Sequence, residues 1–351
     1  MVQVWTNGVG IPGAAVRRAT DVEAAGFDGM TVVDSQNLSG DPYVALALAA
    51  KATERLLLAT GVTNPYTRHP AVTASSIATV QAESVGRAML GIGRGDSALA
   101  HLGRAPVSVR EFEGYLQRVQ AYLRGEEVPF EEGADLDRLR LANQPTSSRI
   151  AWIRPGKYPR VPVDVAATGP KVIQAAARHA DRITFALGAD PERIRWGIDT
   201  AREARDAAGL NPAMPFGAYV NVVVHDDPEE ARRIGEGGIS LFTRFSAMHG
   251  TAVGPTSAED RAVFEAVHDA YDMTSHSFAG SPQAQHLAGE FAERFAILGP
   301  ASYCIERLGK LVELGLDRLV IVGPSAGADP ALAREAESRF AAEVLPTLHR
   351  L

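Results

Sequence analysis

The sequence has a single cysteine, no long hydrophobic run and no excess of positive charge, and each of these features excludes a class of protein. The one cysteine, Cys304, rules out an internal disulfide and a thiolate metal cluster, and it fits a reducing, cytoplasmic compartment. The longest apolar run, residues 43–50, is far shorter than the roughly 20 residues of a membrane-spanning helix. The 35 basic and 42 acidic residues give a formal net charge of −7, and no basic stripe is present. We therefore expect neither membrane insertion nor nucleic-acid binding.

Two common catalytic patterns are also missing. No Gly-x-Ser-x-Gly elbow follows a predicted strand, which argues against a serine hydrolase. The histidines at 268, 276 and 286 lack the i, i+4 spacing of a helical zinc site, so no metal site is predicted.

Short β-rich segments alternate along the chain with longer segments of helical periodicity. We predict strands over 2–6, 29–34, 56–62, 88–92, 163–167, 183–186, 216–224 and 318–322. We predict helices over 13–25, 42–53, 70–84, 107–123, 170–179, 191–208, 228–244 and 330–345. Six of these helices begin at a proline, where the missing N–H costs no hydrogen bond. Eight strand-and-helix units in this order predict an α/β fold, a closed (β/α)₈ TIM barrel with its active site on the loops after the strands.

Two long segments interrupt this alternation, at about 125–162 and 247–299. Both are weakly periodic and contain several prolines, and we interpret them as insertions into one domain that spans residues 1–351. Loops of this length inside a compact domain are commonly functional, and the second insertion is the better candidate for a lid.

The run TGVTNPYTRHP, residues 60–70, directly follows the third predicted strand. It resembles the third-strand motif of the bacterial-luciferase-like superfamily, specifically the coenzyme F420-dependent branch typified by methylenetetrahydromethanopterin reductase. The runs RAMLGIGRGD (87–96) and ATGPK (167–171) resemble the glycine-rich loop and the phosphate-side loop of that branch. The resemblance covers about residues 1–208. It implies a reductase that transfers a hydride between the deazaflavin and a small substrate of unsaturated or iminium type.

The resemblance also implies where the coenzyme lies. In such enzymes the peptide that matches Gly61–Val62 is cis and forms a bulge under the central ring of the deazaflavin. The implied coenzyme contacts are Asp34, Gly61, Val62, Thr63, Gly93, Gly95, Thr168, Gly169, Pro170, Gly188 and Ala189. Gly169 and Pro170 also open a predicted helix, whose backbone N–H groups and dipole favour a phosphate, although an ordinary strand-to-helix turn would give the same sequence.

Asp96 and Asp34 are the predicted catalytic residues. Asp96 matches an acidic position of the methylene-carrier reductases, and we expect it to face the substrate as the acid, but it also suits a helix N-cap before Ser97. We expect Asp34 to hold the ring and the substrate in register. Many deazaflavin enzymes of the superfamily have Asp-His at this point, whereas this chain has Asp34-Ser35. A different proton donor, or none, is therefore favoured.

Two other functions and two structural questions stay open. The chain could be an FMN-dependent monooxygenase that uses reduced flavin and O₂, or a non-catalytic flavin-binding barrel. His69, within the matched third-strand run, is a further candidate for ligand contact. The helix over 42–53 is apolar nearly all round, which predicts a homodimer through the second and third helices unless the chain's own insertions cover it.

Overall fold

The structure is a computed structural model that describes residues 2–131, 136–153, 156–287 and 289–351. Eight parallel strands close into a barrel in the order β1-β2-β3-β4-β7-β8-β9-β11, and β11 pairs back with β1, as predicted. The strands are β1 Gln3–Gly8, β2 Gly29–Val32, β3 Leu57–Thr60, β4 Ala88–Ile92, β7 Val163–Ala167, β8 Arg182–Phe185, β9 Phe216–Val224 and β11 Arg318–Val322.

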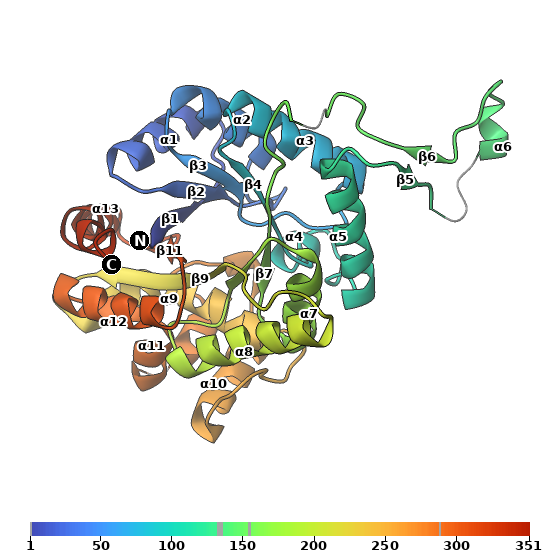
Figure 1. Cartoon of the computed structure of the whole chain (residues 1–351). Coiled ribbons are helices and arrows are strands. Elements are labelled where there is room, and N and C mark those ends of the chain that lie inside the picture. The colour runs from blue at the N-terminus through green and yellow to red at the C-terminus, as the bar shows by residue number, and fades with distance from the viewer. Residues whose placement is uncertain (1, 132–135, 154–155, 288) are drawn as a thin grey trace.

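An outer layer of helices surrounds the barrel (Figure 1). These helices are α1 Ala15–Ala24, α2 Pro42–Ala52, α3 Pro70–Glu83, α5 Val109–Leu123, α7 Pro170–His179, α8 Pro191–Ala207, α12 Ala301–Glu313 and α13 Pro330–Arg339. After α13 the chain continues through a π-helical turn, Phe340–Val344, into α14 Leu345–Leu348. Outward-facing strand residues such as Leu58, Leu90 and Val165 are fully buried against this layer. Within the described ranges, no helix has the length and apolar character needed to cross a membrane.

One predicted outer helix lies elsewhere in the fold. The segment predicted as a helix over 228–244 forms α9, Pro228–Ser246, but α9 packs against β9, β10 and α10 of the second insertion. The outer position before β11 belongs to α12, which contacts α8 and β9 and which the sequence analysis did not predict. The excursion after β9 therefore begins at Pro228 and not at residue 247. Helical periodicity predicts a helix but not the side of the barrel on which it packs.

The two insertions have different shapes. The first contains a short antiparallel pair, β5 Val128–Pro129 and β6 Ser147–Ser148, and the helix α6 Leu136–Leu139, which Figure 1 shows projecting away from the barrel. The excursion after β9 continues beyond α9 with α10 Ala258–Asp269, two 3₁₀ turns at Met273–Ser275 and Pro282–His286, α11 Gly289–Phe295 and β10 Ile297–Gly299. Strand β10 pairs in parallel with the last residues of β9.

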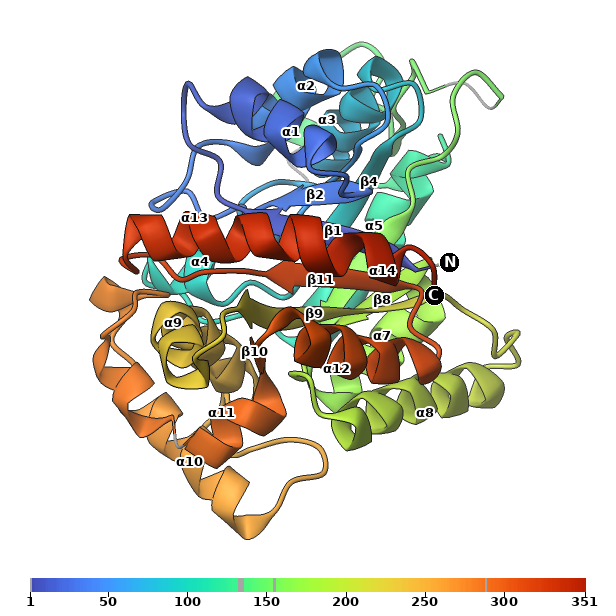
Figure 2. The ribbon, with the colours of Figure 1, turned by 90° about the vertical axis from the view of Figure 1, so that its left-hand side faces the viewer.

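The barrel interior is filled near the N-terminal ends of the strands. The indole of Trp5 packs on Gly29, where a Cβ would lie 2.5 Å from the ring, so glycine is required there. The Arg318 guanidinium lies 4.1 Å from the Trp5 ring centroid, and its Nη1 lies 3.1 Å from Oδ2 of Asp164. Because these side chains close this end, a ligand would reach the barrel axis from the C-terminal ends of the strands. Figure 2 shows α4 (Ser97–Ala100), α9 and α10 at that end, and the two chain termini side by side at the other.

Candidate active site

The ends of β3 and β4 form a backbone surface with few side chains. The Gly61–Val62 peptide is cis, as the resemblance implied. A Cβ on Gly61 would lie 2.4 Å from Oγ1 of Thr31, so no larger residue fits. The Thr63 carbonyl accepts a 3.0 Å hydrogen bond from the N–H of Gly93 on the next loop. The structure thus brings together the predicted ring-contacting residues of these two loops.

Asp34, one of the two predicted catalytic residues, lies below the surface of the site. Its side chain is 1% exposed. The carboxylate accepts hydrogen bonds from Nε2 of Gln36 (2.5 Å), Oγ1 of Thr63 (2.6 Å) and Nη1 of Arg68 (2.5 Å). The same guanidinium donates to Asp41 (2.8 Å). Asp34 therefore ties the loop after β2 to the loop after β3, and this geometry favours a positioning role over direct contact with ligand.

Asp96, the other predicted catalytic residue, is paired with an arginine that the sequence did not indicate. It follows Gly95, whose φ is +81°. Its side chain makes no capping hydrogen bond to α4, so the structure does not have the alternative helix cap. Oδ2 of Asp96 instead accepts from Nη1 of Arg244 near the end of α9, and the two side chains are only 9% and 13% exposed. Asp96 is thus a hydrogen-bond acceptor held across the mouth of the barrel, and this pairing offers no support for its predicted role as the acid.

The N-terminus of α7 is the more suitable of two neighbouring helix ends for an anion. Gly169 precedes the helix, Pro170 occupies its first turn, and that turn has neither a side-chain cap nor an acidic residue. At α8 the Asp190 carboxylate already accepts from the N–H of Glu192 (2.8 Å), and Glu192 adds a second negative charge. Because carboxylates occupy the start of α8, the start of α7 is the more favourable position for a phosphate.

The other residues predicted to bind the phosphate differ in whether the fold leaves them available to it. Thr168 lies beside Gly169, with its Oγ1 3.4 Å from the Ala186 carbonyl. Gly188 packs on the ring of Phe295, where a Cβ would lie 2.5 Å away. The N–H of Ala189 donates to the Phe295 carbonyl (2.7 Å) and the residue is fully buried. Ala189 therefore has no N–H to offer a phosphate, which removes it from the predicted set of donors.

His69, the further candidate, serves as the N-cap of α3. Its Nδ1 accepts from the N–H of Ala71 (3.2 Å), and its side chain is exposed. Nothing in this arrangement directs the imidazole toward the barrel mouth.

Sequence reasoning missed a group of side chains that faces Asp96 from α9 and the second insertion. The Arg244 guanidinium lies 4.6 Å from the ring centroid of Tyr271. The hydroxyl of Tyr271 is 2.9 Å from Nδ1 of His276. Burial lowers the pKa of His276 to about 4 and raises the pKa of Tyr271. Arg244 ends a predicted helix, and Tyr271 and His276 stand in a weakly periodic stretch, so only the fold could associate them with the site.

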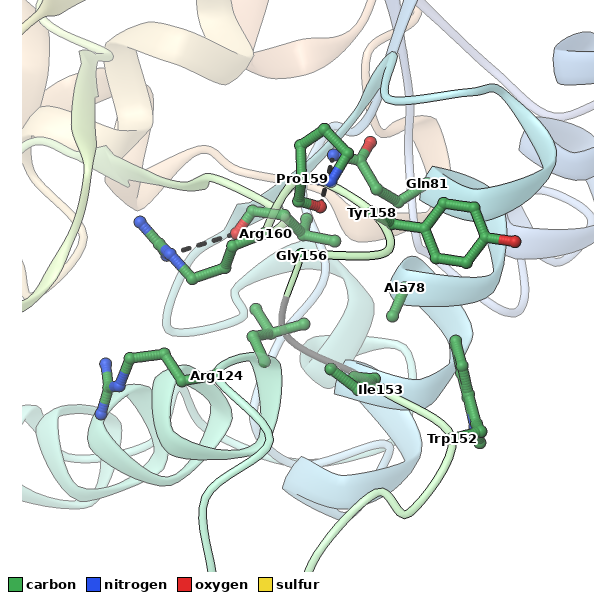
Figure 3. Close-up of a pocket in the computed structure, with 11 residues that line it drawn as sticks. Ala78, Gln81, Arg124, Trp152, Ile153, Gly156, Tyr158, Pro159 and Arg160 are labelled. Carbon is green, nitrogen blue, oxygen red and sulfur yellow. Dashed lines mark hydrogen bonds between the residues drawn. The ribbon is translucent and has the colours of Figure 1, made fainter.

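Two hollows lie on the outside of the barrel, and neither contains a predicted site residue. The first is a cavity of about 240 Å³ between α3, α5 and the segment before β7, where Trp152, Tyr158 and Pro159 form one wall (Figure 3). The second, of about 310 Å³, lies between α5 and α7. Toward the barrel mouth, Phe242 of α9 packs on Tyr219 of the interior face of β9, with ring centroids 5.7 Å apart.

Comparison with known proteins identifies the family of this chain. The sequence profile of the family described as luciferase-like monooxygenase matches residues 4–318. The chain is 24% identical over 310 residues to a 5,10-methylenetetrahydromethanopterin reductase of Methanolobus tindarius, covering 86% of this chain and 87% of that protein. It is 27% identical over 343 residues to an F420-dependent glucose-6-phosphate dehydrogenase of Beutenbergia cavernae, covering 93% and 90%.

The fold is also similar to that of a solved structure. The coenzyme F420-dependent tetrahydromethanopterin reductase from Methanopyrus kandleri superposes with a TM-score of 0.74 at 21% identity, over 98% of this chain and 99% of that one. At this identity the likeness establishes the fold. Because the family profile spans most of the sequence, we conclude that the chain is an enzyme of the luciferase-like monooxygenase family.

Proposed function

We propose that this protein is a coenzyme F420-dependent oxidoreductase that transfers a hydride between the deazaflavin and an unsaturated or iminium-type substrate. The observation that carries the proposal is the combination of a glycine-lined surface at Gly61 and Gly93 with the uncapped, acid-free N-terminus of α7. A planar ring needs close approach to backbone, and its phosphate arm needs N–H donors without a competing carboxylate. The relatives whose names specify F420 support the same assignment.

Residues of this chain would then bind the coenzyme and orient it. Thr168, Gly169 and Pro170 would hold the phosphate, and the Gly61–Val62 bulge would lie beneath the ring. Asp34 would fix the loop after β3 through Thr63 and would not touch the ligand itself. When bound, the coenzyme supplies the hydride chemistry.

The absence of a histidine after Asp34 suits an iminium acceptor. An iminium carbon takes a hydride while the nitrogen keeps the electron pair of the former double bond, so no proton is required. A carbonyl acceptor would need a proton on oxygen, and Asp96, engaged by Arg244, is poorly placed to give one. We therefore propose that Asp96 orients the substrate.

An FMN-dependent monooxygenase is the second candidate, and the description of the family favours it. To distinguish the two, purified protein is mixed under anaerobic conditions with reduced F420 and candidate acceptors, and separately with reduced FMN under oxygen. We expect F420 fluorescence to reappear as the coenzyme is oxidised, with no substrate oxygenation in the FMN reaction. Turnover with FMN but not with F420 would make the protein an FMN-dependent monooxygenase. Binding of a coenzyme without turnover in either reaction would favour a non-catalytic flavin-binding barrel.

A further inference from the structure

Arg244, Tyr271 and His276, which we call the clasp, form a continuous line of contacts behind Asp96. Arg244 pairs with the carboxylate, Tyr271 stacks on the guanidinium at 4.6 Å, and its hydroxyl meets Nδ1 of His276 at 2.9 Å. The ring of His276 then lies edge-on to that of His101, 6.0 Å away, at the end of the same short helix that Asp96 precedes. The excursion after β9 therefore touches the loop after β4 at two points.

The backbone around the clasp is fixed by close packing. The N–H of Ala279 donates to the Ala326 carbonyl after β11 (2.8 Å), and the N–H of Gly280 donates to the Glu236 carboxylate on α9 (2.6 Å). A Cβ on Gly237 would lie 2.3 Å from the Ser277 carbonyl, so α9 and this segment approach as closely as glycine allows. Since β11 and β4 stand on opposite sides of the barrel, the segment that carries Tyr271 and His276 spans its mouth.

The charges of the clasp are arranged to hold a guanidinium in place. The phenol of Tyr271 stays neutral because burial raises its pKa, and it presents an electron-rich ring face to Arg244. The imidazole of His276 is neutral as well, so it can accept the Tyr271 hydroxyl at Nδ1. Arg244 is largely buried, and the Tyr271 ring stacked on its guanidinium holds it in the direction in which it pairs with Asp96.

We propose that Tyr271 is a positioning residue that fixes Arg244 and, through it, the orientation of Asp96 at the substrate end of the site. The Asp96 side chain makes no hydrogen bond to α4, so its ion pair with Arg244 orients the carboxylate. This inference rests on the proposed function for its kinetic readout, while the coupling of the three side chains can be measured without any ligand.

The test compares Tyr271→Leu, Tyr271→Phe, Arg244→Met and the Tyr271→Leu/Arg244→Met double variant with wild type. Tyr158→Leu, an exposed tyrosine at the opposite end of the barrel, is the matched control. Three quantities are measured for each: the Kd for oxidised F420 by fluorescence, kcat and KM for the acceptor, and the melting temperature.

We expect Tyr271→Leu to lower kcat/KM about tenfold with the F420 Kd unchanged, and Tyr271→Phe to keep most activity because the ring remains. The double variant should lose no more than Arg244→Met alone, in kcat/KM and in melting temperature, because the two residues act as a unit. Additive losses, a Tyr271→Phe variant as poor as Tyr271→Leu, or a Tyr271→Leu variant indistinguishable from the control would each overturn the inference. If the wild type fails to use F420, the proposed function is wrong, but additivity of the melting shifts still decides whether the clasp is coupled.

Discussion

At the scale of single residues, the two predicted carboxylates differ in their partners. Asp34 binds Arg68, which is 34 positions away, and Asp96 binds Arg244, which is 148 positions away. The sequence located both aspartates at strand ends, because they follow recognisable strands and glycines. It could not supply the arginines, since Arg68 reaches Asp34 from the loop after β3 and Arg244 reaches Asp96 only because α9 crosses the barrel mouth. The roles that we propose for the two aspartates therefore rest on the fold and not on the motifs.

Replacing Asp96 by Asn removes the ion pair but keeps the size of the side chain. We expect kcat to fall at least tenfold while the F420 Kd stays within about twofold, because we propose that the pair orients the substrate and not the coenzyme. Steady-state kinetics and a fluorescence titration measure the two effects. Unchanged turnover would mean that Asp96 has only a structural role, and weakened coenzyme binding would place it on the wrong side of the ring.

The buried pair inside the barrel permits a prediction of stability. Asp164→Asn leaves the Arg318 charge 2% exposed beside Trp5 with no carboxylate, and we expect a loss of about 3–5 kcal/mol in the free energy of unfolding. Urea titration followed by circular dichroism measures it. Adding Arg318→Met to Asp164→Asn should recover much of the loss, and a double variant as unstable as the single one would contradict this account.

At the scale of elements, the proline-marked helix starts and the eight barrel strands were predictable because each is a local signal. Pro42, Pro70 and Pro170 open α2, α3 and α7 as expected. The place of α9 was not predictable, because its amphipathic face would suit the outer layer equally well. Nor was β10, a strand of three residues that forms only because β9 extends beyond its other partners.

One arginine joins the second insertion to the barrel. Arg193 on α8 is buried and donates to the Pro255 carbonyl (2.9 Å) and to Oγ of Ser246 (2.8 Å), and it stacks on Phe264 of α10 at 4.8 Å. Burial lowers its pKa to about 10, so it stays charged at neutral pH.

We expect Arg193→Met to loosen the insertion while leaving the barrel folded. Limited proteolysis should then cut within residues 247–270 much faster than in wild type, with little change in circular dichroism. Arg195→Met, an exposed neighbour on the same helix, is the control. Equal cleavage rates in the two variants would show that Arg193 does not fasten the insertion.

At the scale of the whole molecule, α2 and α3 leave apolar residues uncovered. Val44 and Leu48 on α2 are 61% and 48% exposed, and Val72 on α3 is 50% exposed. In the described residues neither insertion covers these positions. This favours a homodimer over the alternative that the chain's own insertions bury the helix. We propose that a second copy binds there.

The Val44→Asp/Leu48→Asp variant should be monomeric in sedimentation velocity at micromolar concentration, whereas wild type should be a dimer. Leu210→Asp, on a different face, should leave the dimer intact. A monomeric wild type under these conditions would contradict the proposed interface.

For the barrel as a whole, we propose that Trp5 and Arg318 fill one end and that the coenzyme binds at the other, with its phosphate at α7. Gly169 allows a direct test, because its φ of −88° suits any residue and a Cβ there would meet nothing within 4 Å. Asp and Asn are both good N-caps, so neither substitution should harm α7. They differ in charge alone.

The measurement is a fluorescence titration of oxidised F420 into wild type, Gly169→Asp and Gly169→Asn. We predict that Gly169→Asp raises the Kd at least tenfold, since its carboxylate would repel the phosphate, while Gly169→Asn stays within about threefold of wild type. Equal affinities of the Asp and Asn variants for F420 would contradict the placement of the phosphate at α7 and with it the proposed site.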